Sequence, residues 1–255
     1  MGKKKQKAAK KQNKAVTPKK QVNASKGSSF DIVKPVSLYI QLLSPIHLGS
    51  GQADVNVDAE IIHDDLGMPY FPARRLKGLL YESGLEIAEM AEASNLNLFT
   101  KQEWDELFQH DCVGRVQVEI PNLYLLNSKA MAAEWSYLES KYPEFFRKED
   151  VMESYTTVRY QTKIDDETGA AVDSSLHNMR VLDEGLVFTG ELSLQNGNQR
   201  SWEMLGLAVR NLTQAGLKRN RGFGRISCTL KQNGGDITGD LVNKALAQAG
   251  GEGNK

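Results

Sequence analysis

The sequence predicts an α+β protein whose main elements follow the ferredoxin-like order strand, helix, strand, strand, helix, strand. Three observations lead to this prediction. Apolar residues recur with the period of strands in some segments and with the period of helices in others. Turn-forming residues separate these segments. A long polar insertion divides the second main strand from the third, and the 255-residue chain is long enough to bury a proper core.

The N-terminal arm, residues 1–32, is rich in lysine and almost free of branched apolar side chains, which predicts disorder. It serves either to bind a polyanion or only as a solubilising tail. Residues 1–34 hold eleven Lys and one Asp, so the rest of the chain holds 21 basic and 31 acidic residues. Because nucleic-acid affinity comes mainly from Lys and Arg contacts with phosphates, this acidic body predicts that any nucleic-acid site is local.

The folded domain is predicted over residues 33–232, with a first strand at 36–44 (VSLYIQLLS). The β-branched and aromatic residues of that segment favour a strand. A long helix is expected to open at Pro72, which suits the first helical turn, and to reach about Ala93, because apolar residues recur there with helical spacing. Gly84 allows a break in this helix.

Carboxylates gather between this strand and this helix, where a loop over 46–57 is followed by a predicted short strand near 58–63. A hydrated Mg²⁺ commonly uses one or two carboxylates together with substrate phosphates. The candidates are Asp54, Asp58, Asp64 and Asp65. Turn formation explains the last two, because they precede a glycine. It does not explain Asp58, which lies in a strand-like segment, and this singles Asp58 out.

Three elements are predicted between the long helix and the insertion. The sequence TKQE at the start of 100–109 has the capping-box pattern of a short helix. Alternation predicts a strand at 115–126, with Pro121 at an edge or a bulge. Residues 128–141 are predicted to be helical.

The insertion, about residues 150–182, contains a predicted β-hairpin. Segments rich in Thr, Val and Tyr flank the turn sequence DDETG at 165–169. Both flanks are polar on both faces, so the hairpin has little apolar surface with which to pack against the body. We expect it to project.

A strand at 185–194, a helix at 202–215 and a strand at 226–230 complete the predicted domain. Residues 233–255 are rich in glycine and weakly patterned. We expect them to form a flexible C-terminal tail, with at most a short helix near 241–247.

Two basic clusters are candidate phosphate sites. Arg74, Arg75 and Lys77 stand at the start of the long helix, where the helix dipole disfavours cations unless an anion binds. The second cluster is KRNRGFGR, whose arginines match phosphate oxygens and whose phenylalanine can stack on a base. Its candidates are Lys218, Arg219, Arg221, Phe223 and Arg225. The alternatives are a surface face paired with nearby acids and a solvated turn.

Cysteine usage and hydropathy indicate the compartment. Cys112 and Cys228 are the only cysteines and form no CxxC pair, which argues against a disulfide framework or zinc knuckle and fits a reducing cytoplasm. No apolar run approaches membrane-spanning length, and the Lys-rich N-terminus lacks the apolar part of a signal peptide. We expect a cytoplasmic protein with no membrane partner.

Three blocks together resemble the RAMP superfamily of CRISPR-associated proteins, in particular the backbone subunits of type III effector complexes of the Csm and Cmr kind. The blocks are IHLGSG followed by VDAEIIHDDLGMPYFPARRLKGLL, then RYQTKIDDETGAAVDSSLHNMRVLDEGLVFTGEL, and GLAVRNLTQAGLKRNRGFGRI. The resemblance implies a modified ferredoxin-like (RRM-like) palm that binds the backbone of a CRISPR RNA (crRNA). The inserted hairpin would be a thumb that wedges into the guide–target duplex.

The resemblance also implies partners and site residues. The partners are crRNA, target RNA, copies or paralogues of this chain and the large polymerase-like type III subunit. In catalytic members a loop aspartate cuts target RNA with a divalent metal, and the pattern DAEIIHDDLGMPYFPARRLKG places that aspartate at Asp58. Mg²⁺ or another divalent metal would bind there, with Asp54 as a further candidate carboxylate. Guide contacts fall on the two basic clusters, His47 and Ser50, and duplex kinking falls on Arg159, Lys163 and Ile164.

Three hypotheses follow. The first is a guide-binding backbone subunit that is also a metal-dependent endoribonuclease. The second is a structural crRNA-binding subunit without an active site. The third is a metal-independent crRNA-processing endoribonuclease with His47 as general base. It ranks last because processing enzymes of this superfamily typically carry two ferredoxin-like domains, and this chain has elements for one.

Overall fold

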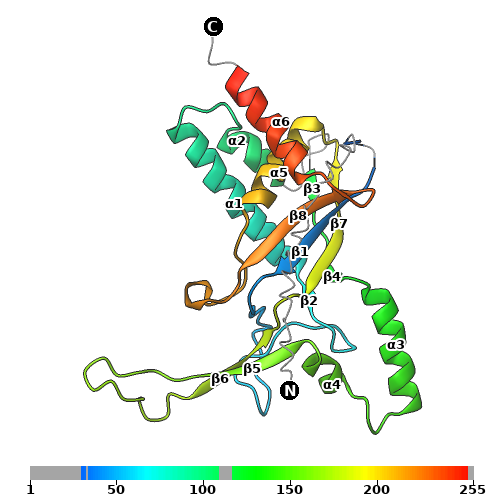
Figure 1. The fold of residues 1–255 in the computed structure, drawn as a ribbon, viewed down its shortest axis with the longest axis vertical. Helices are drawn as coiled ribbons and strands as arrows, with labels where there is room; N and C mark the ends of the chain where they lie inside the picture. Colours follow the sequence, from blue (N-terminus) through cyan, green and yellow to red (C-terminus); the bar gives the residue numbers. More distant parts are fainter. Residues whose placement is uncertain (1–29, 33, 109–116, 252–255) are drawn as a thin grey trace, which may run out of the picture.

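The computed structural model describes residues 30–32, 34–108 and 117–251 (Figure 1). The disorder predicted for the Lys-rich arm falls almost wholly outside this part of the chain. Within it, helices and antiparallel strands follow one another along the chain, so the predicted α+β class is confirmed.

An antiparallel sheet forms the centre of the described part. Its strands are β1 (Val36–Leu42), β2 (Tyr70–Phe71), β3 (Gln117–Glu119), β4 (Leu123–Leu125), β7 (Val187–Gln195), β8 (Ile226–Gln232) and β9 (Gly235–Asp236). They lie in the order β2-β4-β7-β1-β8-β9, and β3 also pairs with β7. β1 is therefore central, with Tyr39 opposite Thr189 on one side and Thr229 on the other.

The helices divide into two groups at opposite ends of the molecule (Figure 1). One group contains α1 (Ala73–Ala93), α2 (Lys101–Phe108), α5 (Gln199–Asn211) and α6 (Thr238–Gly251). The other contains α3 (Ser128–Lys141), which has the predicted bounds, and α4 (Lys148–Glu153). No helix in the described ranges combines the length and the apolar character needed to cross a membrane.

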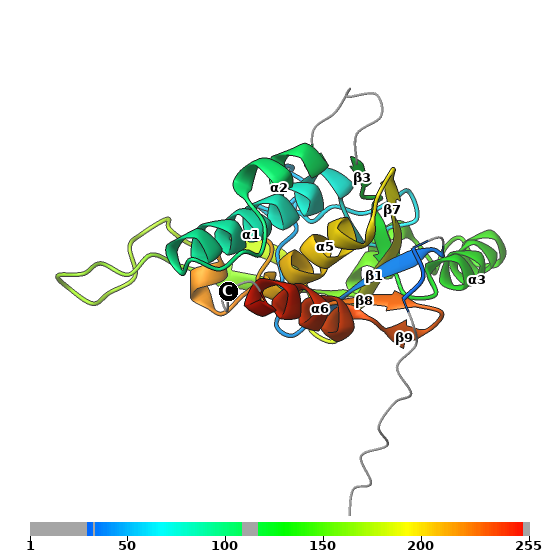
Figure 2. The ribbon, with the colours of Figure 1, turned by 90° about the horizontal axis from the view of Figure 1, so that it is seen from above.

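The core lies between the sheet and the first group of helices. Val36, Leu38 and Ile40 of β1 are fully buried, while the residues between them are only partly covered, so one face of the strand packs inward. α5 contacts α1, α6 and β8, which explains why its residues 201–209 are all buried (Figure 2). Burial raises the pKa of the Cys228 thiol to about 12, so this cysteine stays protonated.

Gly84 does not break α1, which is continuous. A Cβ built on Gly84 would lie 2.0 Å from Cε2 of Trp104, so the glycine lets the indole ring of α2 pack directly against the α1 backbone. The Trp104 indole also donates a hydrogen bond of 2.9 Å to the carbonyl of Tyr81. The predicted capping box holds α2 in place at its start: Thr100 N donates to Glu103, and Glu103 N donates to the Thr100 hydroxyl.

The prediction of a strand near 58–63 is wrong. Only isolated bridges form there, between Gly49 and Ile61 and between His63 and Pro69. The backbone of this segment bonds instead to two different partners, the preceding loop and β6 (His177–Leu182). A strand ladder needs one continuous partner, and this segment has none.

The flexible tail predicted from residue 233 is also wrong for the part that the structure describes. Residues 235–251 form β9 and α6, and Leu241 is fully buried against α5. The contact depends on a small residue, since a Cβ built on Gly206 would lie 2.8 Å from Cβ of Leu241. Close approach of this kind leaves little trace in an Ala- and Gly-rich sequence.

The insertion contains the predicted hairpin, formed by β5 (Thr156–Gln161) and β6. The turn is held by the Asp165 carboxylate, which accepts hydrogen bonds from the backbone of Glu167 and Thr168. Its base is packed, with Met179, Val181 and Leu182 buried. Its tip extends away from the body in both views (Figures 1 and 2), as the polar flanks predicted.

We predict that Gly84→Ala destabilises the protein by about 1–3 kcal/mol, because the added methyl must displace a fully buried indole ring. Gly78→Ala in the same helix is the control. Nothing lies within 4 Å of a Cβ at Gly78, so that change should stabilise by roughly 0.5–1 kcal/mol. Urea unfolding measures both variants, and equal stabilities of the two would contradict the packing described.

Candidate functional site

The site is built on a loop between β1 and α1 that we call the Asp58 loop, residues 50–60. Its neck is closed by backbone hydrogen bonds, from Ser50 N to the Glu60 carbonyl (2.7 Å) and from Glu60 N to the Gln52 carbonyl (3.0 Å). The Ser50 hydroxyl donates to the same Glu60 oxygen at 3.1 Å. Ser50, predicted to contact RNA, therefore has its hydroxyl in the neck of the loop.

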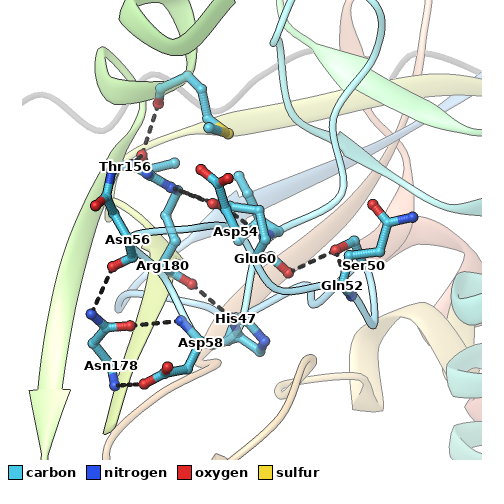
Figure 3. A network of polar contacts seen from close by, with 12 residues as sticks. His47, Ser50, Gln52, Asp54, Asn56, Asp58, Glu60, Thr156, Asn178 and Arg180 are labelled. Atoms are coloured by element: carbon cyan, nitrogen blue, oxygen red, sulfur yellow. Dashed lines mark hydrogen bonds and ion pairs between the residues drawn. The ribbon is translucent and has the colours of Figure 1, made fainter.

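A buried ion pair fastens the neck to β6. Nε of Arg180 lies 2.9 Å and 3.1 Å from the two carboxylate oxygens of Glu60, and both side chains are only 9% exposed (Figure 3). Arg180 also donates to the Thr156 hydroxyl (3.2 Å), and its backbone N–H donates to the Ala59 carbonyl (3.0 Å). Charges in this environment need fixed partners, so the pair sets the position of the loop on the hairpin.

His47 joins the same network from below the neck. It is 4% exposed, and its Nδ1 lies 2.7 Å from the Arg180 carbonyl oxygen. A carbonyl oxygen only accepts, so Nδ1 carries a hydrogen and donates it. The His47 carbonyl accepts from Leu217 N at 3.2 Å, which links β6 to the chain just before residues 218–225. His47, the predicted general base, is thus a buried residue that joins β6 to the chain at Leu217. Its contact with RNA remains a prediction.

Asp58 is exposed and lies against β6. Its Oδ2 accepts a hydrogen bond from Asn178 N at 2.8 Å, and its own N–H donates to Asn178 Oδ1 at 2.7 Å (Figure 3). Asp54 is held locally, with Oδ1 accepting from Val55 N at 2.7 Å. Figure 3 shows the Asp58 side chain turned toward Asn178 and away from Asp54. The structure does not bring the two predicted carboxylates together.

The donor set fits a divalent metal only if the substrate supplies further ligands. Across the described residues, no group of three or more His, Cys, Asp or Glu side chains could hold an ion. Asp64 is used in a turn, accepting from the backbone of Leu66 and Met68. An ion at Asp58 would resemble Mg²⁺ sites made from one carboxylate, waters and substrate phosphates. The metal stays a prediction.

One cleft unites the two predicted basic clusters. It has a volume of about 330 Å³, and Arg74, Arg75 and Arg219 line it beside His47. We call it the arginine cleft. The Arg75 guanidinium also donates a hydrogen bond to the Gly49 carbonyl, which ties the cleft to the start of the Asp58 loop. A local cluster of cations in an acidic body is therefore present, as the charge pattern indicated.

The basic loop, residues 218–225, contributes Arg219 to one wall of this cleft. Two glycines shape it, Gly216 just before the loop and Gly224 within it. Gly216 has φ +80°, and a Cβ there would lie 2.6 Å from the Ile46 side chain. Gly224 has φ +81°, and a Cβ there would lie 2.1 Å from the Ala215 carbonyl oxygen. Only glycine fits either position without strain. The loop can therefore fold tightly over the end of β1 and hold Arg219 at the cleft.

The other predicted basic residues lie elsewhere. Lys77 stands 5.8 Å above the Phe108 ring of α2, and burial lowers the pKa of its amine. Lys218 donates to Gln161 Oε1 on the hairpin at 2.5 Å. Its pKa is lowered mainly by burial and also by the nearby positive charge of Arg221. Three further candidates, none of them lining the cleft, are the exposed Arg221 and Arg225 and the partly buried Phe223.

The predicted thumb residues lie on the outer part of the hairpin. Arg159 is exposed in β5, Lys163 is exposed beyond it, and Ile164 is 51% exposed and bridges to Ala171. An exposed isoleucine beside cations is compatible with a duplex contact. No such contact is tested by the structure.

The sequence analysis missed Glu60, Asn178 and Arg180. A signal for two of them was present. Glu60 interrupts an apolar run with Ala59 and Ile61, and Arg180 stands between Met179 and Val181. A charge within an apolar strand-like run is rarely buried without a partner, and these two charges are opposite in sign. Asn178 left no comparable signal.

Comparisons with known proteins give one family-model match and similar solved structures. A family model described as RAMP superfamily matches residues 39–227. The solved type III-B Cmr-beta bound to cognate target RNA contains a similar chain, with a TM-score of 0.54 and 12% identity over 82% of this chain and 98% of that one. The apo state of Cmr-beta gives 0.52 and 12% over 79% and 99%. No curated protein matches in sequence.

We predict that Arg180→Leu destabilises the protein by about 3–5 kcal/mol, because Glu60 is left as an unpaired buried charge. Arg147→Leu is the control. Its ion pair with Asp150 is exposed, so the loss should stay below about 1 kcal/mol. Chemical denaturation at neutral pH measures both. Similar losses for the two variants would show that the buried pair does not fix the loop.

Proposed function

Because this chain belongs to the RAMP superfamily, we propose that it is a backbone subunit of a type III CRISPR effector complex that binds crRNA and cleaves complementary target RNA at the Asp58 loop with a divalent metal. One observation carries the proposal. The arginine cleft and the Asp58 loop are joined by bonds through Gly49, His47 and Arg180, so a cationic groove and an exposed carboxylate are held in a fixed relation.

The sheet supports the interpretation of the body as a ferredoxin-like palm. The elements β1, α1, β4, β7, α5 and β8 follow one another along the chain, and the four strands lie in the order β4-β7-β1-β8. This order supports the proposal of a split βαβ palm. The projecting hairpin, which leaves the chain between β4 and β7, would be the thumb.

The arginine cleft would bind the guide through its phosphates. Arg74, Arg75 and Arg219 present planar guanidinium groups, which match two phosphate oxygens at once and do not lose their charge. Contacts with the backbone position a nucleic acid without reading its sequence. Base pairing between guide and target would then carry specificity, and the protein would recognise the shape of the duplex.

Asp58 would act at the scissile phosphate. One carboxylate oxygen is occupied by Asn178 N–H, and no described residue donates to the other. That second oxygen would orient the attacking 2′-hydroxyl or help to hold the metal. A bound divalent ion would supply positive charge that stabilises the phosphate in the transition state.

The partners follow from the same proposal. They would be crRNA, target RNA and other Cas subunits, among them copies or paralogues of this chain and the large polymerase-like subunit. The similar solved structures are Cmr-beta, one of them described as bound to cognate target RNA, and this supports RNA and Cas proteins as partners. A cytoplasmic location would suit such a complex.

A structural, non-catalytic crRNA-binding subunit is the second candidate. It is favoured by the donor set at Asp58, where no described group of three metal-ligating side chains is found. Guide binding at the arginine cleft is common to both candidates, so only a cleavage experiment separates them.

We predict that Asp58→Asn lowers target cleavage by about 100-fold or more, the range for loss of a positioned catalytic group. Asparagine keeps the acceptor for Asn178 N–H but removes the charge, so guide binding should not change. The measurement is cleavage of complementary RNA by the assembled complex, with Asp54→Asn as the matched control. EDTA should abolish cutting by the wild type.

Two results would overturn this assignment. Unchanged cutting by Asp58→Asn would remove the carboxylate from the mechanism. Cutting that survives EDTA but is lost in His47→Ala would favour the metal-independent processing enzyme.

We predict that Arg219→Gln weakens crRNA binding at least about tenfold, because a charge-assisted hydrogen bond to phosphate is lost. The slope of log affinity against log salt should fall in magnitude by about 0.7, the value for one phosphate contact on a single strand. Lys244→Gln, an exposed residue of α6 that does not line the cleft, is the control and should change neither quantity. An unchanged slope for Arg219→Gln would exclude a phosphate contact.

A further inference from the structure

Asn178 connects the hairpin to the Asp58 loop by three hydrogen bonds. Its side-chain Nδ2 donates to the Asn56 carbonyl at 2.9 Å, and its Oδ1 accepts from Asp58 N at 2.7 Å. Its backbone N–H donates to Asp58 Oδ2 at 2.8 Å. A side-chain amide that both donates to and accepts from one segment imitates a neighbouring strand. The loop is therefore paired to β6 at this point by a side chain.

Arg180 stands two residues further along β6, and successive even positions of a strand face the same side. The contacts of the two residues differ in burial. Arg180 and Glu60 are almost completely covered, whereas Asn178 is partly exposed and Asp58 is exposed. The buried contact holds the neck of the loop in place. The exposed contact is left to orient the carboxylate at its tip.

We propose that Asn178 is a positioning residue, which fixes the Asp58 carboxylate so that one oxygen faces the RNA and cleavage depends on the position of the hairpin. The inference rests on the proposed function. Asn178 does not touch the substrate in this scheme. It acts by holding the backbone of residues 56–58, which in turn decides where the Asp58 side chain points.

Strand β6 would also transmit a displacement of the hairpin to Asp58. Asn178 is paired with Tyr160 of β5. The preceding residue, His177, has its Nε2 3.4 Å from Nζ of Lys218 in the basic loop. A displacement of the hairpin by a bound duplex would move Asn178 with it. The Asp58 loop would follow through the three hydrogen bonds.

The test compares Asn178→Leu with Thr157→Val in the full complex. Leucine has the same number and branching of side-chain heavy atoms as asparagine but makes neither side-chain hydrogen bond to the loop. Thr157 also bonds across the hairpin base, to Asp183 at 2.7 Å, but not to the Asp58 loop, so Thr157→Val controls for a general weakening of the hairpin.

For Asn178→Leu we expect kcat of target cleavage to fall at least roughly tenfold, with KM and crRNA affinity within about twofold of the wild type. Amide hydrogen exchange of residues 56–58 should quicken by roughly tenfold or more, because two hydrogen bonds are lost. Thr157→Val should change none of these quantities. A fall in kcat with unchanged KM separates positioning from a loss of RNA binding.

The outcomes distinguish this inference from the function on which it rests. A wild-type complex that does not cut complementary RNA overturns the proposed function, and the positioning role falls with it. A wild type that cuts, together with an Asn178→Leu variant that cuts equally well, overturns only the role of Asn178. Equal losses of kcat in Asn178→Leu and Thr157→Val would also overturn it, because the effect would then belong to the hairpin as a whole.

Discussion

The ion pair between Arg180 and Glu60 is the contact on which the arrangement of the site depends. Both groups are almost fully buried and make further hydrogen bonds, so neither charge can leave its partner without a large cost in free energy. Residues far apart in the chain meet at this point: the neck of the Asp58 loop, the hairpin strand β6 and, through His47, the start of the basic loop. The pair thus fixes the relative positions of these three segments.

The two parts of the proposed site have different physical requirements. To bind a guide as proposed, the arginine cleft would need positive charge and tolerance of small shifts of the RNA, since phosphates are alike along a strand and guanidinium groups adapt to them. In the proposed reaction the Asp58 carboxylate would need an exact direction, because a small displacement of a reacting group lowers the rate sharply. The cleft arginines Arg74 and Arg75 are exposed side chains in the first turn of α1, whereas the carboxylate is bound to the hairpin by directional hydrogen bonds.

What the sequence could predict was local. The capping box at Thr100 and the helix at 128–141 depend on neighbours within a few residues, and both are observed. The clustering of arginines was predictable because it contrasts with an acidic body. The pairing of Glu60 with Arg180 joins residues 120 positions apart, and nothing in either local segment specifies the other. The predicted strand at 58–63 failed for the same reason. The helix allowed at most near 241–247 proved to be the longer α6, which packs by close approach to Gly206.

The insertion leaves and re-enters the sheet at neighbouring points. β4 and β7 are paired, with Leu125 opposite Phe188, and Leu126 N donates to the Val187 carbonyl at 2.8 Å. The ends of the inserted segment are therefore held together by the sheet itself, and the entropy of closing it changes only slowly with its length. The projecting outer part of such a segment can therefore change in length while the sheet stays intact. Its base is fixed, because Met179, Val181 and Leu182 are buried there and Arg180 meets Glu60.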